Sequence, residues 1–225
     1  SEKALSHNLD RITVPEGYQP RAALGFSISF LILLLDKLNL SNNSPSYALE
    51  EAVKKLIKFK DNFNSEINPA TVIASRIYNK LPVIYGSDEI MGIIGLRFRG
   101  QLQENAKMMA FHNVIPEQNH NEIEGWTVNE DIMRRFSIIW LHDVDDHSGT
   151  KARMDISSSL LESALECQLT ISQSGSFRSE RLLKLIHYTD WISFYAALLN
   201  DVDPTPVNRI QELKSKIAKQ AKLLL

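Results

Sequence analysis

The chain has 225 residues, 44% of them apolar and 23% charged, with 25 basic side chains against 27 acidic ones. This composition argues against a disordered chain, and the net charge of −2 argues against a nucleic-acid partner or an anionic membrane surface. The single cysteine, Cys167, cannot form an internal disulfide, so we expect a reducing compartment and a cytoplasmic location.

The beginning of the chain combines helical and extended patterns. Residues 2–8 predict the end of a helix, and Arg11–Val14 predicts a short strand. An α/β domain rarely opens with the end of a helix, so we expect further chain upstream. The apolar run Ala22–Leu35 is shorter than the roughly 20 residues that span a bilayer. We expect it to form a buried helix, and we expect no membrane segment.

Strands and helices alternate along the rest of the chain. The patterns predict helices over residues 45–63, 69–80, 88–111, 151–166 and 178–199 and after Pro206, and strands over Leu81–Tyr85, Phe136–Leu141 and Gln168–Ser172. Four or five strands separated by helices predict an α/β fold, a three-layer α/β/α sandwich with a mainly parallel sheet. Ligands of such sheets bind at the carboxyl ends of the strands. The candidate turns are those after Val14, Tyr85, Leu141 and Ser172.

The loop His142–His147 places two imidazoles and three carboxylates within six residues, which suggests a metal cluster. The alternative is a polar loop between a buried strand and a helix, where Asp and His serve as turn and capping residues. Transition-metal sites usually draw at least one ligand from elsewhere in the chain. We therefore favour the structural interpretation and expect no metal.

The stretch Ser172–Ser176 leads from a strand into a helix, where backbone N–H groups could hold a phosphate. It lacks the glycine spacing of a dedicated phosphate loop, so an ordinary connection is favoured.

One face of the helix after Tyr85 carries Arg97, Gln101 and Glu104 at positions i, i+4 and i+7. Taken alone, this stripe favours a surface ion pair. His120 lies in a polar cluster before Gly125, and taken alone it favours a turn residue.

Five motifs then appear in order along the chain. They are Gln19–Gly25, Gly100–Lys107, Asn119–Ile123, Glu180–Leu183 with Asp190–Trp191, and Asp203–Val207. Together they resemble the C-terminal half of the bifunctional phosphoglucose/phosphomannose isomerases, members of the sugar isomerase (SIS) superfamily, over nearly the whole chain. The resemblance implies a flavodoxin-like SIS sandwich with C-terminal helices.

The resemblance also implies a two-domain organisation. Residues 1–20 would be an interdomain segment or a remnant of a preceding SIS domain, and residues 21–225 would be the C-terminal SIS domain. In that family the first domain carries the Ser/Thr loop that grips the substrate phosphate, and this sequence has no counterpart of that loop. A fragment without it would fold and dimerise but would be inactive alone.

The resemblance assigns roles to individual residues. Glu104 matches the base that moves a proton between C1 and C2 of the open-chain sugar through a cis-enediol(ate), and His120 matches the ring-opening imidazole. In related isomerases this histidine comes from the second subunit, which implies a homodimer. Arg21, expected at the end of the first strand, matches the arginine beside the developing enediolate.

Two further residues lie near the C-terminus. Lys214 is our choice for the family's C-terminal ring-opening lysine, with Lys216 as the alternative. Thr205 would help to shape a substrate pocket that accepts both C2 epimers.

The implied activity is the interconversion of glucose 6-phosphate and mannose 6-phosphate with fructose 6-phosphate. It needs no metal or organic cofactor, because the substrate's own carbonyl acidifies the transferred proton. The alternative is a non-catalytic SIS module that binds a sugar phosphate or mediates dimerisation. A base and a ring-opening group kept together favour the enzyme.

Overall fold

The computed structural model describes residues 2–42 and 44–223. The chain divides into two compact units, Ser1–Lys58 and Phe59–Leu225, and each is described by itself. Among the described residues, no helix combines the length and the apolar character needed to cross a membrane.

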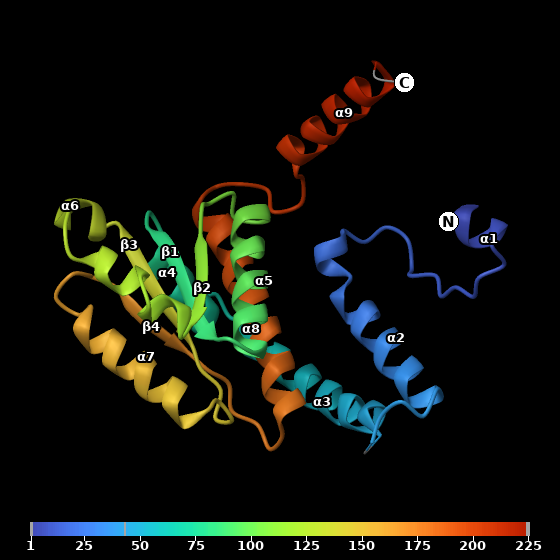
Figure 1. Cartoon of the computed structure of the whole chain (residues 1–225), viewed down its shortest axis with the longest axis horizontal. Helices are drawn as coiled ribbons and strands as arrows, with labels where there is room; N and C mark the ends of the chain where they lie inside the picture. The colour runs from blue at the N-terminus through green and yellow to red at the C-terminus, as the bar shows by residue number, and fades with distance from the viewer. Residues whose placement is uncertain (1, 43, 224–225) are drawn as a thin grey trace. The chain divides into compact units, whose positions relative to one another are not determined.

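The first unit is built from helices, labelled in Figure 1: α1 (Glu2–Ser6), the short 3₁₀ helix η1 (Pro20–Ala22), α2 (Leu24–Lys37) and α3 (Pro45–Phe59), whose last residue belongs to the second unit. The helical turn predicted at the start is confirmed. The prediction of a strand at Arg11–Val14 is wrong, because this segment forms a loop and pairs with none of the described strands. Arg21 therefore lies in η1 and not at the end of a strand.

The prediction of a buried helix over Ala22–Leu35 is wrong for this chain by itself. α2 forms as expected but contains no buried residue, and Leu31 and Leu33 are 59% and 53% exposed. The apolar run of α2 extends around the helix, and the other helices of this unit cover only part of the surface of α2. The turn after α2 is closed by Asp36, whose carboxylate accepts hydrogen bonds from Ser41 Oγ at 2.7 Å and Ser46 N at 2.9 Å.

The second unit alternates strands and helices. In chain order these are η2 (Lys60–Phe63), α4 (Pro69–Ile77), β1 (Leu81–Ser87), α5 (Ile90–Glu104), β2 (Phe111–Ile115), η3 (Glu117–Asn119), η4 (Glu122–Trp126), α6 (Glu130–Met133), β3 (Phe136–Leu141), α7 (Ser148–Leu160), β4 (Gln168–Ile171), α8 (Arg178–Leu199) and α9 (Asn208–Leu223). The described strands form one parallel sheet in the order β2-β1-β3-β4. The predicted α/β class with a parallel sheet is confirmed.

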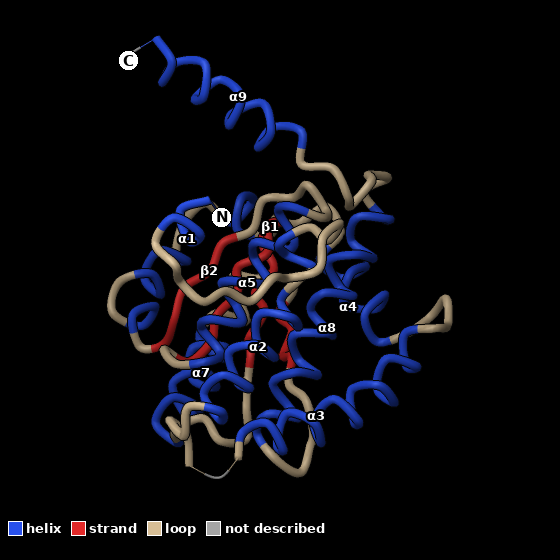
Figure 2. The backbone as a smooth tube through the Cα atoms, turned by 90° about the vertical axis from the view of Figure 1, so that its right-hand side faces the viewer, coloured by secondary structure: helices blue, strands red, loops and turns tan. Residues whose placement is uncertain are grey.

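Helices cover both faces of this sheet, and Figure 2 shows the strands with helices of the same unit around them. On one face, Ile84 and Ile139 pack with Phe98 of α5 and Ile192 of α8. On the other face, Tyr85 and Trp140, with ring centroids 5.1 Å apart, pack with Met154 of α7 and with Trp126. Burying one such side chain contributes about 1.5–3 kcal/mol, so the two cores hold the three layers together.

The helix predicted over residues 88–111 ends seven residues early, and β2 was not predicted. α5 stops at Glu104, and Lys107 adopts the left-handed backbone conformation at φ 56°, which breaks the helix before β2. Glu89, and not the expected Asp88, occupies the N-cap position. Gly92 allows α5 to approach β2, because a Cβ there would come within 2.7 Å of a Val114 side-chain carbon.

The sheet has two distinct edges, which we call the carboxyl edge and the amino edge after the ends of the strands. α5 and α8 each follow a strand, so both begin at the carboxyl edge and end at the amino edge. Glu104 and the connection from α8 to α9 therefore lie at the amino edge. The loops after β1, β2, β3 and β4 lie at the carboxyl edge.

Candidate active site

The candidate base, Glu104, is the last residue of α5 and is half-buried. It lies at the amino edge of the sheet. The general rule for ligands of parallel sheets pointed instead to the carboxyl edge. The position of Glu104 was thus suggested by its resemblance to the family's motif and not by the position of the strand ends.

The face of α5 that carries Glu104 is bound to α8 through Asp190. Arg97 donates to both carboxylate oxygens of Asp190, with Nη1–Oδ1 at 2.6 Å and Nη2–Oδ2 at 3.1 Å, and Gln101 Nε2 donates to Oδ1 at 2.7 Å. Burial raises the pKa of Asp190, and the positive charge of Arg97 opposes that shift. The stripe is therefore part of an interhelical network. Arg97 forms its ion pair with Asp190 of α8.

A second bond joins the two helices beside Glu104. Asn105 Nδ2 donates to Ser193 Oγ at 2.9 Å, and Ser193 Oγ donates to the backbone oxygen of Asp190 at 2.7 Å. The helix end that carries the candidate base is thus held on both sides of Glu104. Asp190 belongs to a motif visible in the sequence, but its partners could not be predicted from the sequence. The available signal was an acidic residue on a helix rich in apolar residues, which indicates that its carboxylate needs a partner.

Thr205 lies in the connection between α8 and α9, which Figure 1 shows passing the end of α5. Lys107 Nζ donates to the backbone oxygen of Glu104 at 2.6 Å and to that of Pro206 at 2.7 Å. Within the connection, Thr205 N donates to Asp203 Oδ1 at 2.8 Å, and this lowers the pKa of Asp203. The structure therefore brings Glu104 and Thr205 to the same edge of the sheet.

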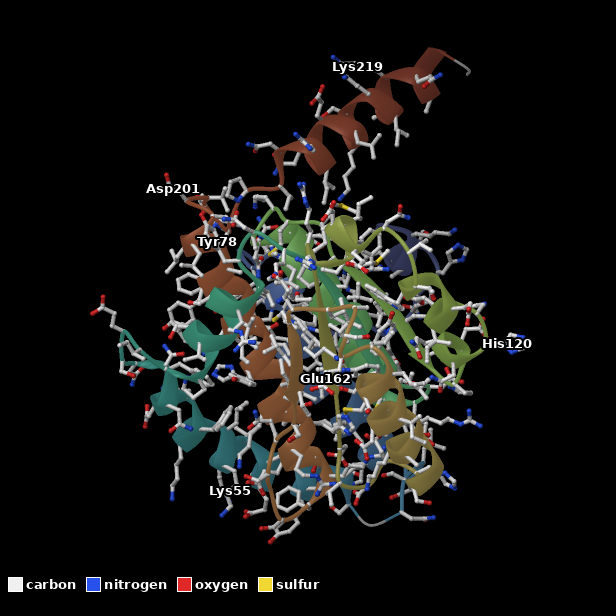
Figure 3. The ribbon with its side chains drawn as sticks, turned by 90° about the vertical axis from the view of Figure 1, so that its left-hand side faces the viewer. Lys55, Tyr78, His120, Glu162, Asp201 and Lys219 are labelled. Atoms are coloured by element: carbon white, nitrogen blue, oxygen red, sulfur yellow. The ribbon has the colours of Figure 1, made fainter. Side chains whose placement is uncertain are left out.

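His120 follows η3 at the carboxyl edge. It is exposed, and Figure 3 shows its side chain pointing outward. It lines a surface pocket of about 390 Å³ with Arg153 of α7 and with Glu117.

The loop that bears His120 is anchored by Glu122. Its carboxylate accepts from Tyr85 Oη at 2.5 Å and from Asn113 Nδ2 at 2.6 Å. Burial and the Glu122 carboxylate raise the pKa of Tyr85, so the phenol stays a hydrogen-bond donor. Glu122 is part of the motif that contains His120, but its anchoring role was not predicted from the sequence.

Glu104 and His120 are not together within one chain. They lie at opposite edges of a sheet whose strands have 4–7 residues, which corresponds to a separation of about 13–23 Å along the strands. A sugar carbon chain cannot bridge that distance while both residues act on adjacent atoms.

The two remaining candidates belong to η1 and to α9. Arg21 is half-buried in η1 of the first unit. Lys214 is exposed in α9, and the alternative Lys216 forms an ion pair with Glu212 at 2.6 Å. Figure 3 shows α9, on which Lys219 is labelled, and side chains of the described part of this helix are exposed.

Polar side chains of the loop His142–His147 are hydrogen-bonded to other residues of the chain. Asp143 accepts from Arg181 Nε at 2.9 Å and Nη2 at 3.0 Å, and Asp146 accepts from Ser87 Oγ at 2.9 Å. The Arg181 guanidinium lowers the pKa of Asp143. His147 Nδ1 accepts from the N–H of Gly149 at 3.1 Å and caps α7. Over the part of the chain that the structure describes, no group of three His, Cys, Asp or Glu residues is placed to hold a metal ion.

The stretch Ser172–Ser176 is closed in the same way. The N–H of Ser176 donates to Glu180 Oε2 at 2.9 Å, and Lys184 Nζ donates to Glu180 Oε1 at 2.6 Å. Glu180 is 4% exposed. A carboxylate of the chain itself therefore accepts the Ser176 N–H, one of the groups that could have held a phosphate.

Comparisons with known proteins agree with this architecture. A bifunctional phosphoglucose/phosphomannose isomerase of Caldicellulosiruptor bescii is 39% identical over 221 residues, covering 96% of this chain and 65% of the relative. One of Aquifex aeolicus is 34% identical over 220 residues, covering 98% of this chain and 65% of the relative. The chain thus spans just under two thirds of the length of these relatives.

Among solved structures, a putative phosphosugar isomerase from Clostridium difficile 630 matches with a TM-score of 0.57 and 14% identity. The match covers 93% of this chain and 64% of that protein, and it supports the fold alone. The family profile described as "Bacterial phospho-glucose isomerase C-terminal SIS domain" matches residues 66–217. From the parallel sheet, the relatives and this profile together, we conclude that the chain belongs to the family of bacterial phospho-glucose isomerase C-terminal SIS domains.

Proposed function

We propose that the chain is the C-terminal SIS domain, residues 21–225, of a two-domain aldose–ketose isomerase. The enzyme converts glucose 6-phosphate and mannose 6-phosphate reversibly into fructose 6-phosphate in the cytoplasm. Residues 1–20 form the interdomain segment, and a preceding SIS domain supplies the phosphate grip. The length of the relatives supports this organisation, because the chain covers 65% of each.

The observation that carries the proposal is the placement of Glu104. It ends a helix whose last turns are fixed by Asp190 and Ser193, and it lies at the same edge as Thr205. A carboxylate held in this way can take a proton from one carbon and return it to its neighbour, which is the step that an aldose–ketose isomerase needs. Two relatives with this activity in their names support the assignment.

The other groups act on the same intermediate. His120 exchanges the proton of the ring oxygen during ring opening, assisted by Lys214, for which Lys216 is the alternative. Arg21 stabilises the negative charge of the cis-enediolate, by roughly a few kcal/mol. Thr205 shapes the pocket around C2. The reaction needs neither a metal nor an organic cofactor, because the open-chain carbonyl acidifies the transferred proton.

We further propose that the active enzyme is a homodimer. Glu104 and His120 lie at opposite edges of one sheet, so the histidine that meets Glu104 comes from a second copy of the chain. The exposed leucines of α2 support association, because a continuous apolar helix is costly to leave in water.

The test of the proposed activity is a coupled assay for fructose 6-phosphate formation from each hexose phosphate, with the full-length gene product. Glu104→Gln should lower turnover of both sugars by at least about a hundredfold, because an amide cannot accept the proton. Glu124→Gln, at an exposed position, is the matched control and should remain active. No turnover by the wild type would contradict the proposal and favour a non-catalytic sugar-phosphate-binding or dimerisation module.

The shared site is tested by mixing two inactive variants, Glu104→Gln and His120→Ala. If each site takes Glu104 from one copy and His120 from the other, random subunit exchange restores about one quarter of the wild-type activity. A mixture that stays inactive, with mixed dimers present, would contradict the shared site.

A further inference from the structure

Lys107 joins two segments that are about one hundred residues apart in the sequence. Its ammonium group donates to the backbone oxygen of Glu104 and to that of Pro206, at 2.6 Å and 2.7 Å. One side chain therefore fixes the end of α5, which carries the candidate base, against the connection that carries Thr205. Because both acceptors are backbone atoms, these bonds restrain the backbone of the two segments relative to each other.

The backbone at Lys107 is itself specialised. Its φ of 56° lies in the left-handed region, which turns the chain sharply after α5. The turn is also bound to the end of α8, because Asn200 Nδ2 donates to the backbone oxygen of Ala106 at 2.9 Å. Asn200 thus holds the start of the connection, and Lys107 holds its far end at Pro206.

The connection between these ties is internally ordered. Thr205 N donates to Asp203 Oδ1, which closes the chain into a short turn just before Pro206. The geometry of this turn is set locally, and a contact at Pro206 helps to set its position relative to Glu104. Lys107 supplies a direct link, because its ammonium group binds the backbone oxygens of both Glu104 and Pro206.

We propose that Lys107 is a positioning residue that sets Thr205 relative to Glu104 and thereby determines the selectivity between glucose 6-phosphate and mannose 6-phosphate. The proposal rests on the proposed function, in which Glu104 transfers the proton at C2 and Thr205 shapes the pocket there. The two sugars differ only in configuration at C2. A small displacement of Thr205 alters their relative transition-state energies more than it alters binding of the parts they share.

Lys107 is exposed, so its replacement removes two hydrogen bonds without opening a core cavity. If Lys107 had a purely structural role, its loss would lower the stability of the protein, or it would lower kcat/KM for both sugars by the same factor. A positioning role changes the ratio of the two kcat/KM values. That ratio separates the two explanations.

The experiment compares Lys107→Met with the wild type in the full-length protein, measuring kcat/KM for glucose 6-phosphate and for mannose 6-phosphate. Methionine keeps the length of the side chain and loses the donors. We expect the ratio of the two values to change by at least about fivefold. Lys107→Arg keeps donors for both carbonyl groups and should bring the ratio back to within about twofold of the wild-type value.

The matched control is Lys151→Met, which removes another lysine bound to a backbone carbonyl group, Val144 O at 2.5 Å, at the carboxyl edge. It should leave the ratio unchanged. An unchanged ratio in Lys107→Met, with a folded and active enzyme, would overturn the proposal. If Lys107→Met does not fold, the arginine variant decides, because a ratio shifted by more than fivefold there would also contradict positioning by the two donors. A wild type that turns over neither sugar would instead overturn the proposed function.

Discussion

The two edges of the sheet hold their charged groups in different ways. At the carboxyl edge, Asp143 and Arg181 are 4% and 5% exposed and bind each other through two hydrogen bonds, and Glu180 is bound by Ser176 and Lys184. At the amino edge, Glu104 is half-buried and Lys107 is exposed, and Lys107 donates to the backbone carbonyl groups of Glu104 and Pro206.

The difference separates groups that hold the fold from groups suited to chemistry. A carboxylate buried against an arginine has its charge committed to that partner, and losing either one leaves an uncompensated charge. A half-buried carboxylate at the end of a well-anchored helix can meet a substrate. The denser acidic and imidazole cluster at the carboxyl edge is the loop His142–His147, and its bonds to Arg181, Ser87 and Gly149 are structural.

The largest expected effect comes from breaking the carboxyl edge. Arg181→Met leaves Asp143 buried without its cationic partner and should lower the free energy of unfolding by about 3–5 kcal/mol. Chemical denaturation measures the loss. Arg134→Met, which removes an exposed pair with Glu130 at 3.8 Å, is the control and should cost less than about 1 kcal/mol. Equal losses in the two variants would contradict the contrast drawn between buried and exposed pairs.

A second effect concerns the anchoring of the amino edge. Asp190→Asn cannot accept the two-pronged bond from Arg97 as a charged partner, so the last turns of α5 should hold Glu104 less firmly. We expect kcat to fall by about tenfold, with little change in KM. The reverse result, a raised KM at constant kcat, would mean that Asp190 serves substrate binding and not the placement of the base.

The smallest effect is a pH dependence that sharpens the comparison. The guanidinium of Arg181 lowers the pKa of Asp143 in the folded chain below its unfolded value of about 3.9. Its stabilisation is therefore complete above that value and is lost as the pH falls through the lower, folded-state pKa. The stability difference between the wild type and Asp143→Asn, measured by denaturation from pH 7 downward, should shrink below about pH 4. A difference that stays constant to pH 2 would contradict a lowered pKa of Asp143 in the folded chain.

Elements with a strong local pattern were predictable. β3 spans Phe136–Leu141 and α8 spans Arg178–Leu199, both as expected, because a continuous apolar run and a long helical pattern leave few alternatives. β2 has five residues and was not predicted, because its first residue falls within a helical pattern. It forms because it pairs with β1. The residues of Arg11–Val14 suit a strand, but none of the strands that the structure describes pairs with this segment.

By itself, the sequence determined the α/β class, the main elements and the motif residues, including Glu104, His120 and Thr205. Only the tertiary structure decided which of these share an edge, because the direction of each helix across the sheet separates residues 16 positions apart and joins residues about one hundred apart. It also decided that the acidic loop after β3 binds Arg181 and Ser87, since those partners come from other elements. Local spacing sets which groups can lie on one helix face, whereas burial and pairing depend on what the rest of the chain packs against them.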